Sequence, residues 1–120
     1  MQVTHDIFIK GIPYSQAKTR GNLEAPKLWT DTIIDRTRHL QMVEEACELR
    51  ADFVLPADKY PDDLPYGPDL DNLLHRLFNA LKQTVLADDS LITHLESGKR
   101  KADRREKTGV QLTISVVSES

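Results

Sequence analysis

The sequence predicts an α/β fold of the mixed α+β kind, in which helices pack on a mixed sheet. Segments of alternating apolar and polar residues are interleaved with two segments that have apolar residues at three- and four-residue intervals. Helices alternate with strands early in the chain, and two strands close it, which favours a mixed sheet ending in a hairpin. The expected order is strand, helix, strand, helix, strand, strand. The length of 120 residues suits a single domain spanning residues 1–120.

The first half of the chain contains the first strand and helix. Val3–Lys10 alternates loosely and predicts a strand, which Gly11 and Pro13 then end. A helix is expected from about Trp29, because the apolar residues now follow helical spacing. Its apolar positions are Trp29, Ile33, Leu40 and Val43.

The second half begins with the clearest alternation in the chain. Cys47–Leu55 predicts a strand with one buried face, and residues 56–68 have the proline-rich composition of a loop. A strongly amphipathic helix is expected next. A strand starting at Leu91, a basic loop over residues 98–109 and a strand from Val110 to Val116 follow. The apolar positions of the helix are Leu70, Leu73, Leu74, Leu77, Leu81 and Val85.

Composition indicates a folded chain with an expected cytoplasmic location. Hydrophobic residues make up 39% of the chain, which argues against disorder throughout. No apolar run approaches the ~20 residues that cross a bilayer, and the first residues lack the pattern of an export signal. The single cysteine, Cys47, excludes an intrachain disulfide and a thiolate metal cluster.

The charges are distributed unevenly. The net charge is −3, from 16 basic and 19 acidic residues. Residues 99–107 hold six basic side chains against two acidic ones, whereas residues 52–71 hold six aspartates against Lys59 alone. The first segment could attract phosphate, and the second needs cations to offset its self-repulsion.

Two aspartate pairs flank the amphipathic helix, and each has two interpretations. Asp69 and Asp71 could cap the helix, or they could share a metal ion that offsets their repulsion. Asp88 and Asp89 could form a solvated turn or join the same ion. Joining requires the strand that starts at Leu91 to run back beside the helix start or to pair with the strand ending at residue 55. Magnesium suits such a centre, since it prefers carboxylate oxygens and activates water for phosphodiester hydrolysis.

The motifs around this helix resemble those of the RusA-type Holliday junction resolvases. The resemblance is carried by Asp69-Leu70-Asp71-Asn72-Leu73, then Phe78-Asn79-Ala80-Leu81, then Leu86-Ala87-Asp88-Asp89. It implies a RusA-like nuclease domain that forms a homodimer, binds branched DNA at four-way junctions and nicks two opposed strands. The implied cofactor is Mg²⁺, for which Mn²⁺ can substitute.

Carried over by position, Asp69, Asp71 and Asp89 are the expected catalytic, metal-binding carboxylates. His75 stands where the family has a lysine. It is a candidate catalytic residue, and the alternative is an exposed partner of Asp71 at i,i+4 spacing.

Basic residues in the expected turn of the final hairpin are the candidate DNA contacts. They are Lys99, Arg100, Lys101, Arg104 and Arg105. The alternative is a solvated loop whose charge aids solubility.

Three functions are therefore open. The first is a junction-resolving endonuclease. The second is a DNA-structure-binding protein without efficient catalysis, and the third is a metal-dependent nuclease that acts on forks or flaps.

Overall fold

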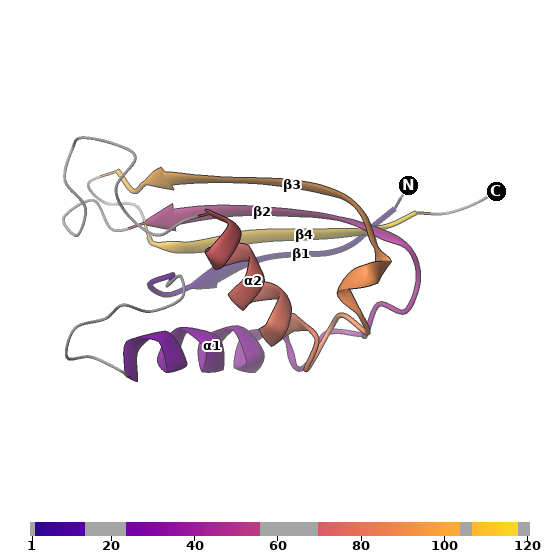
Figure 1. Cartoon of the computed structure of the whole chain (residues 1–120), viewed down its shortest axis with the longest axis horizontal. Helices are drawn as coiled ribbons and strands as arrows, with labels where there is room; N and C mark the ends of the chain where they lie inside the picture. Colours follow the sequence, from indigo (N-terminus) through magenta and orange to yellow (C-terminus); the bar gives the residue numbers. More distant parts are fainter. Residues whose placement is uncertain (1, 14–23, 56–69, 104–106, 118–120) are drawn as a thin grey trace.

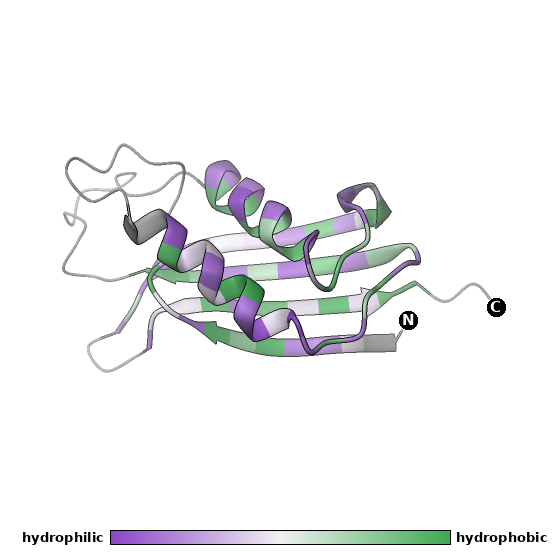
Figure 2. Ribbon diagram, turned by 90° about the horizontal axis from the view of Figure 1, so that it is seen from below, coloured by the Kyte–Doolittle hydropathy of each residue, from purple (hydrophilic) through white to green (hydrophobic). Residues whose placement is uncertain are grey.

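The computed structural model describes residues 2–13, 24–55, 70–103 and 107–117. Within these ranges it has the predicted class and element order, with two helices on a four-stranded mixed sheet. Both helices lie on one face of the sheet, and the described residues leave the other face open (Figures 1 and 2). The elements are β1 (Gln2–Lys10), α1 (Glu24–Thr37), β2 (Cys47–Leu55), α2 (Leu70–Leu81), the short 3₁₀ helix η2 (Asp89–Leu91), β3 (Ile92–Lys101) and β4 (Gly109–Val116).

The strands follow the order β1-β4-β2-β3, so the predicted closing hairpin is wrong. β3 pairs with β2 in parallel, and β4 lies between β1 and β2 with both pairings antiparallel. The reason lies in burial. β2 and β4 bury most of their residues and take the two central places, whereas no residue of β3 is fully buried and β3 forms an edge. The open hydrogen-bonding groups of an edge strand are tolerated there because the strand is polar.

Several element boundaries differ from the predicted ones. α1 ends at Thr37 and α2 at Leu81, so Val43 and Val85 lie outside the helices. Their backbones pair instead, since the amide of Val43 donates to the Val85 carbonyl over 2.6 Å. Thr37 Oγ1 is also 2.7 Å from Thr84 Oγ1, which ties the end of α1 to the turn after α2. β3 continues through Lys101, so the first part of the expected basic loop is strand.

The core fills the space between the helices and one face of the sheet. α2 presents Leu73, Leu77 and Leu81 to it, at helical spacing, and all three are fully buried. α1 contributes two more large buried side chains, Trp29 and Ile33. The strands β1, β2 and β4 contribute Ile9, Leu49, Phe53, Leu112 and Ile114. No helix in the described part of the chain is both long enough and apolar enough to cross a membrane.

Candidate functional site

The start of α2 carries the first candidate residue. Asp71 lies in the first turn and is exposed, on the opposite side of the helix from the buried leucines. Its carboxylate complements the positive end of the helix dipole. Asp69 lies outside the described residues, so the structure places only one member of the predicted pair.

A shallow cavity of about 180 Å³ lies beside this turn, between the two helices. Arg76 reaches α1, where its Nη1 donates to Thr30 Oγ1 over 3.1 Å. His75 is exposed and follows Asp71 by about one helical turn. The side chains around the cavity are Thr30, Asn72, His75, Arg76 and Asn79. The amide and imidazole groups beside this guanidinium can hold a phosphate by hydrogen bonds and charge. Sequence reasoning missed Thr30 and Asn79, because their role depends on how the helices pack.

Asp88 and Asp89 lie in the turn that leads into η2. Asp88 caps this short helix, since its Oδ1 accepts from the amide of Ser90 over 2.9 Å. That backbone hydrogen bond, followed by a side-chain hydrogen bond with Asp89, lowers the pKa of Asp88 below its ordinary value. Asp89 Oδ2 is 3.9 Å from Lys82 Nζ, and both side chains are partly exposed. A capped, solvated turn therefore accounts for the geometry of this pair.

Asp71 and Asp89 lie at opposite ends of α2. Lys82, the partner of Asp89, is the first residue after the helix. The helix has 12 residues and rises about 18 Å between its ends. Figure 1 shows the same arrangement, with η2 at the far end from the start of α2. Among the described residues, no group of three His, Cys, Asp or Glu side chains could hold a metal ion. One chain's described residues therefore do not assemble the predicted centre, because α2 keeps its two acidic ends apart.

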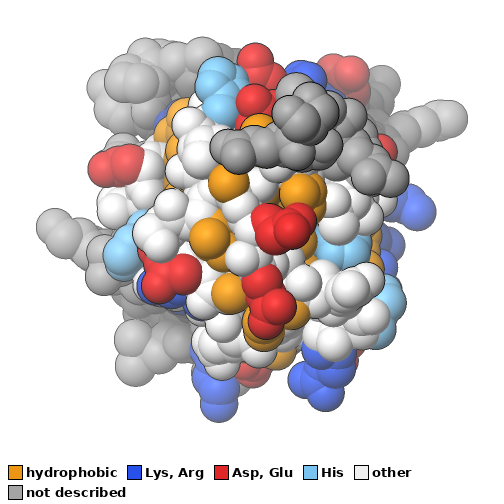
Figure 3. Space-filling model, turned by 90° about the vertical axis from the view of Figure 1, so that its right-hand side faces the viewer, with side chains coloured by type: hydrophobic (Ala, Val, Ile, Leu, Met, Phe, Trp, Pro, Cys, Tyr) orange, Lys and Arg blue, Asp and Glu red, His pale blue; other side chains and the backbone are white. Residues whose placement is uncertain are grey.

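The end of the molecule that holds η2 has an acidic surface. Figure 3 views this end and shows acidic side chains spread over it, with lysine and arginine mostly at its margins. Glu44, Glu45, Asp88 and Asp89 are all exposed in the segments that meet here. Such a surface repels a polyanion unless a cation or a basic partner intervenes.

The basic residues of β3 lie at the other end. Leu55 pairs with Lys101 and Val54 with Arg100, so Lys99–Lys101 finish beside the end of β2. Figures 1 and 2 show that α2 starts at this same end of the sheet. The strand after Leu91 therefore does pair with the strand ending at residue 55, which was one condition for a joined metal site, but the pairing brings cations, and not Asp89, toward the start of α2. Arg104 and Arg105 lie outside the described residues.

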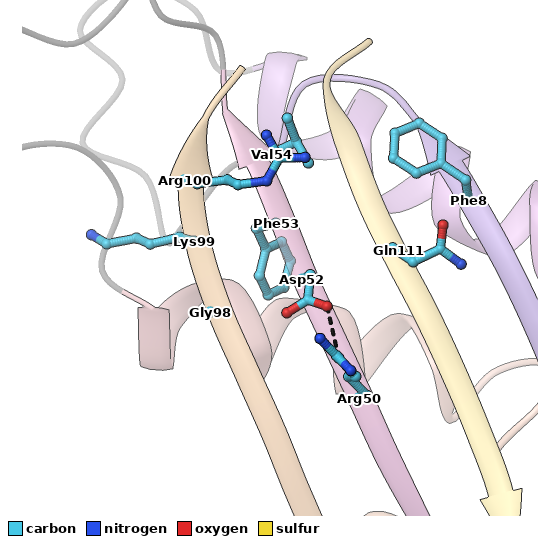
Figure 4. Close-up of a pocket in the computed structure, with 9 residues that line it drawn as sticks. All are labelled: Phe8, Arg50, Asp52, Phe53, Val54, Gly98, Lys99, Arg100 and Gln111. Atoms are coloured by element: carbon cyan, nitrogen blue, oxygen red, sulfur yellow. Dashed lines mark hydrogen bonds and ion pairs between the residues drawn. The ribbon is translucent and has the colours of Figure 1, made fainter. Parts of the chain in front are cut away.

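A larger hollow of about 550 Å³ lies on the open face of the sheet (Figure 4). Arg50 Nε donates to Asp52 Oδ2 over 2.9 Å at one side of it, and Gln111 Nε2 donates to Asp6 Oδ1 over 2.6 Å. In Figure 4, Arg100 reaches over Val54, whereas Lys99 points away past the edge of the sheet. The alternation of residues in β2 and β4 predicts a polar outer face, but it could not predict which strands would be neighbours. We call this feature the open-face hollow, and its lining residues are Phe8, Arg50, Asp52, Phe53, Val54, Gly98, Lys99, Arg100 and Gln111.

Neither a scan against protein-family models nor a search of curated proteins found a match for this chain. The likeness to the resolvases therefore consists of the motifs around α2, and the activity that it implies is a proposal.

Proposed function

We propose that the chain is a cytoplasmic, metal-dependent endonuclease that acts on four-way DNA junctions as a homodimer. One observation carries the proposal: the parallel pairing of β2 and β3 puts Lys99–Lys101 at the end of the fold where α2 begins with Asp71. A nuclease needs cations to hold the phosphate backbone next to carboxylates that hold a metal ion. Together with the motif resemblance, this supports nuclease chemistry at the start of α2.

The residues at this end have complementary roles in the proposal. Lys99–Lys101 contact phosphates and position the duplex without reading its sequence. Asp69 and Asp71 would hold Mg²⁺, which lowers the pKa of bound water and offsets charge on the scissile phosphate when it is bound. Arg76 beside the cavity offers a planar guanidinium for a phosphate oxygen, and His75 is placed to hold or move a proton.

Asp89 can take part only from a second copy of the chain, because α2 separates it from Asp71. The polar face of α2 carries Asp71, His75 and Asn79 at helical spacing, and Lys82 follows directly after the helix. Two such helices running antiparallel about a two-fold axis, ~8–10 Å apart, put the start of one beside the end of the other. Asp89 of the partner subunit then faces Asp71, and the symmetry repeats the site for the opposed strand.

The edge strand β3 favours this arrangement. Its outer edge has no neighbouring strand among the described residues, and Leu95 on the helix side is 40% exposed. If two β3 strands pair antiparallel across a two-fold axis near Glu96, the start of one strand lies beside the end of the other. Because η2 leads directly into β3, this pairing also carries Asp89 toward the partner's Lys99–Lys101 end.

The test is cleavage of a labelled four-way junction by the purified protein, with linear duplex and a replication fork alongside. We expect paired, symmetric nicks confined to the junction with magnesium or manganese and none with EDTA. Asp71→Asn should slow cutting by about a hundredfold or more, because a catalytic metal contributes several kcal/mol at ~1.36 kcal/mol per tenfold in rate.

Asp88→Asn is the matched control, since an asparagine still accepts the Ser90 amide and caps η2. It should cut at nearly the wild-type rate. If all substrates are cut at equal rates, the protein is a metal-dependent nuclease that acts on forks or flaps and is not specific for four-way junctions. Absence of cutting in every condition would reject the nuclease.

The second candidate function is binding of branched DNA without cleavage. The observation that favours it is the separation of Asp71 from Asp89 by the length of α2 within one chain. A protein of this kind would bind the junction equally well with magnesium or EDTA and leave it intact. Its binding would still weaken when Lys99–Lys101 are neutralised, with a shallower salt dependence.

A further inference from the structure

The open-face hollow is built from two neighbouring rows of residues that cross the sheet. In the first row Phe8, Gln111, Asp52 and Gly98 are successive register partners on β1, β4, β2 and β3. In the second row Lys10, Gly109, Val54 and Arg100 are partners in the same way. Residues in register point to the same face of a sheet, so the side chains of Phe8, Gln111, Asp52, Val54 and Arg100 belong to the open face. Lys10, at the end of the edge strand β1, instead lines a separate hollow with residues of α1.

Two glycines make the surface concave. A Cβ at Gly98 would meet only Asp52 Oδ1, at 3.8 Å, so the position beside this carboxylate is open space. Gly109 has a φ of +152°, and a Cβ there would overlap the backbone carbonyl oxygen of Ile9 and lie 2.9 Å from the ring of Phe8. A side chain at Gly109 would thus collide with that ring, and glycine is required for both reasons. The result is a hollow with an aromatic ring at one side and the Val54 side chain in its floor.

The chemistry around the hollow is that of a nucleotide site. Phe8 offers an aromatic surface against which a base can stack. Asp52 Oδ1 faces the space over Gly98 and can accept a hydrogen bond from an exocyclic amino group, as carboxylates do from cytosine. Arg100, at the β3 end of the second row, lines the hollow and can attract a phosphate of the polyanion.

The charges also define the direction of a bound strand. The row on the other side of Gln111 contains Asp6, Thr113, Arg50 and Glu96 as register partners. Its two outer members are acidic, whereas the second row ends in Arg100 beside the hollow. Phosphates are therefore attracted to the side that finishes near Lys99–Lys101 and repelled from the other. The volume of about 550 Å³ is within the ~300–1,000 Å³ of small-ligand sites.

We propose that the open-face hollow binds one nucleotide of an unpaired DNA strand, with its base between Phe8 and Asp52 and its phosphate toward Arg100. The inference rests on the proposed function for the choice of DNA as the ligand. A branched substrate exposes unpaired nucleotides when its arms open. The hollow lies on the face opposite α2, so it holds a strand that leaves the cutting site around the Lys99–Lys101 end of the sheet, past the ends of β2 and β3.

The experiment measures binding of a fluorescein-labelled dC₁₂ strand to the full chain by anisotropy, at pH 7.5 in EDTA so that nothing is cut. Unlabelled dT₁₂, free dCMP, inorganic phosphate and duplex DNA are the competitors. Gly98→Val fills the hollow and suits a strand, because the added Cβ has room. Phe8→Leu removes the ring but keeps an apolar side chain, and Arg100→Gln removes one charge.

We expect Gly98→Val and Phe8→Leu to weaken dC₁₂ binding by about fivefold or more and to change duplex binding by less than twofold, as stacking on one base implies. Arg100→Gln should weaken both and flatten the salt dependence. The control is Arg38→Gln, which removes one exposed cation from the turn after α1 and should change neither. The thermal unfolding of each variant establishes that it is folded.

Equal dC₁₂ affinity for the wild type, Gly98→Val and Phe8→Leu would overturn the inference. Competition by phosphate as strong as by dC₁₂ would also overturn it, since a simple anion site needs no base. The failure of the proposed function is a separate result. If junctions are not cut but dC₁₂ binding is lost in Gly98→Val, the nucleotide site in the hollow is supported and the nuclease activity is rejected.

Discussion

The two ends of α2 each carry an aspartate, but the surroundings of the two are opposite. At the start, Asp71 lies beside a cavity with His75 and Arg76, at the end of the sheet where the cations of β3 finish. At the other end, Asp88 caps η2 and Asp89 pairs with Lys82 within an acidic surface. The first end has groups suited to an anionic substrate. At the second end, the two carboxylates already have local partners, the Ser90 amide and Lys82.

This difference shows that residues from neighbouring sequence motifs, here Asp71 and Asp89, need not lie close together in the fold. The helix between the motifs is rigid, and a rise of about 18 Å separates carboxylates that one metal ion would need within a few ångströms. Two-fold symmetry removes the conflict, because an antiparallel copy brings the second end to the first. The comparison between the ends therefore leads directly to the dimer proposed above.

The largest effect on stability is expected in the helix that holds the two ends apart. Leu77 is fully buried in the middle of α2, so Leu77→Ala should lower the free energy of unfolding by ~2–5 kcal/mol. Leu74→Ala, on a partly exposed position of the same helix, should cost less. Urea unfolding followed by circular dichroism measures both. Equal losses would mean that α2 does not pack as described.

A smaller, pH-dependent effect is expected at Asp88. Its folded-state pKa is lowered, chiefly by the hydrogen bond from Ser90. The ionised form thus stabilises the fold at pH values above the ordinary carboxyl pKa, and this contribution is lost as the pH falls through the lowered pKa. The melting temperature of Asp88→Ala should lie below that of the wild type at pH 7, and the gap should close in acid. If the difference in melting temperature between wild type and Asp88→Ala grows in acid, the ionised carboxylate of Asp88 does not stabilise the fold as described.

The smallest effect is expected for the Lys82–Asp89 ion pair. Its atoms are 3.9 Å apart, with 38% and 46% of the side chains exposed, so solvent screens the attraction. Lys82→Gln should change the free energy of unfolding by less than ~1 kcal/mol. A loss of several kcal/mol would show that the Lys82–Asp89 ion pair stabilises the fold far more than a solvent-exposed pair does.

Sequence reasoning predicts the elements of this fold better than their arrangement. The burial pattern of Cys47–Leu55 and the leucines of α2 follow directly from periodicity, and so do the class and the element order. Which strands lie side by side does not follow from periodicity. β3 and β4 follow one another in the chain, which favours a hairpin, but β2 separates them because its buried residues require two neighbours.

The candidate site was predicted in part for the same reason. The exposed position of Asp71 was predictable from the helix face. The partner strand of Lys99–Lys101 was not, because the order of the strands in the chain favours a hairpin with β4. The position of Asp89 relative to Asp71 depends on where the chain turns after Leu81, and no local pattern encodes it. The open-face hollow depends on the register of all four strands, so its residues do not stand out in the sequence.

The most direct test of the shared site mixes two inactive variants. Asp71→Asn and Asp89→Asn are purified separately, combined, unfolded and refolded together, and assayed on a labelled junction with magnesium. If each site takes Asp71 from one copy and Asp89 from the other, a mixed dimer has one site with both aspartates and one with neither. We predict that the mixture regains single nicks that neither variant makes alone. If the mixture stays as inactive as its components while refolded wild type cuts, the two ends of α2 do not meet across the dimer.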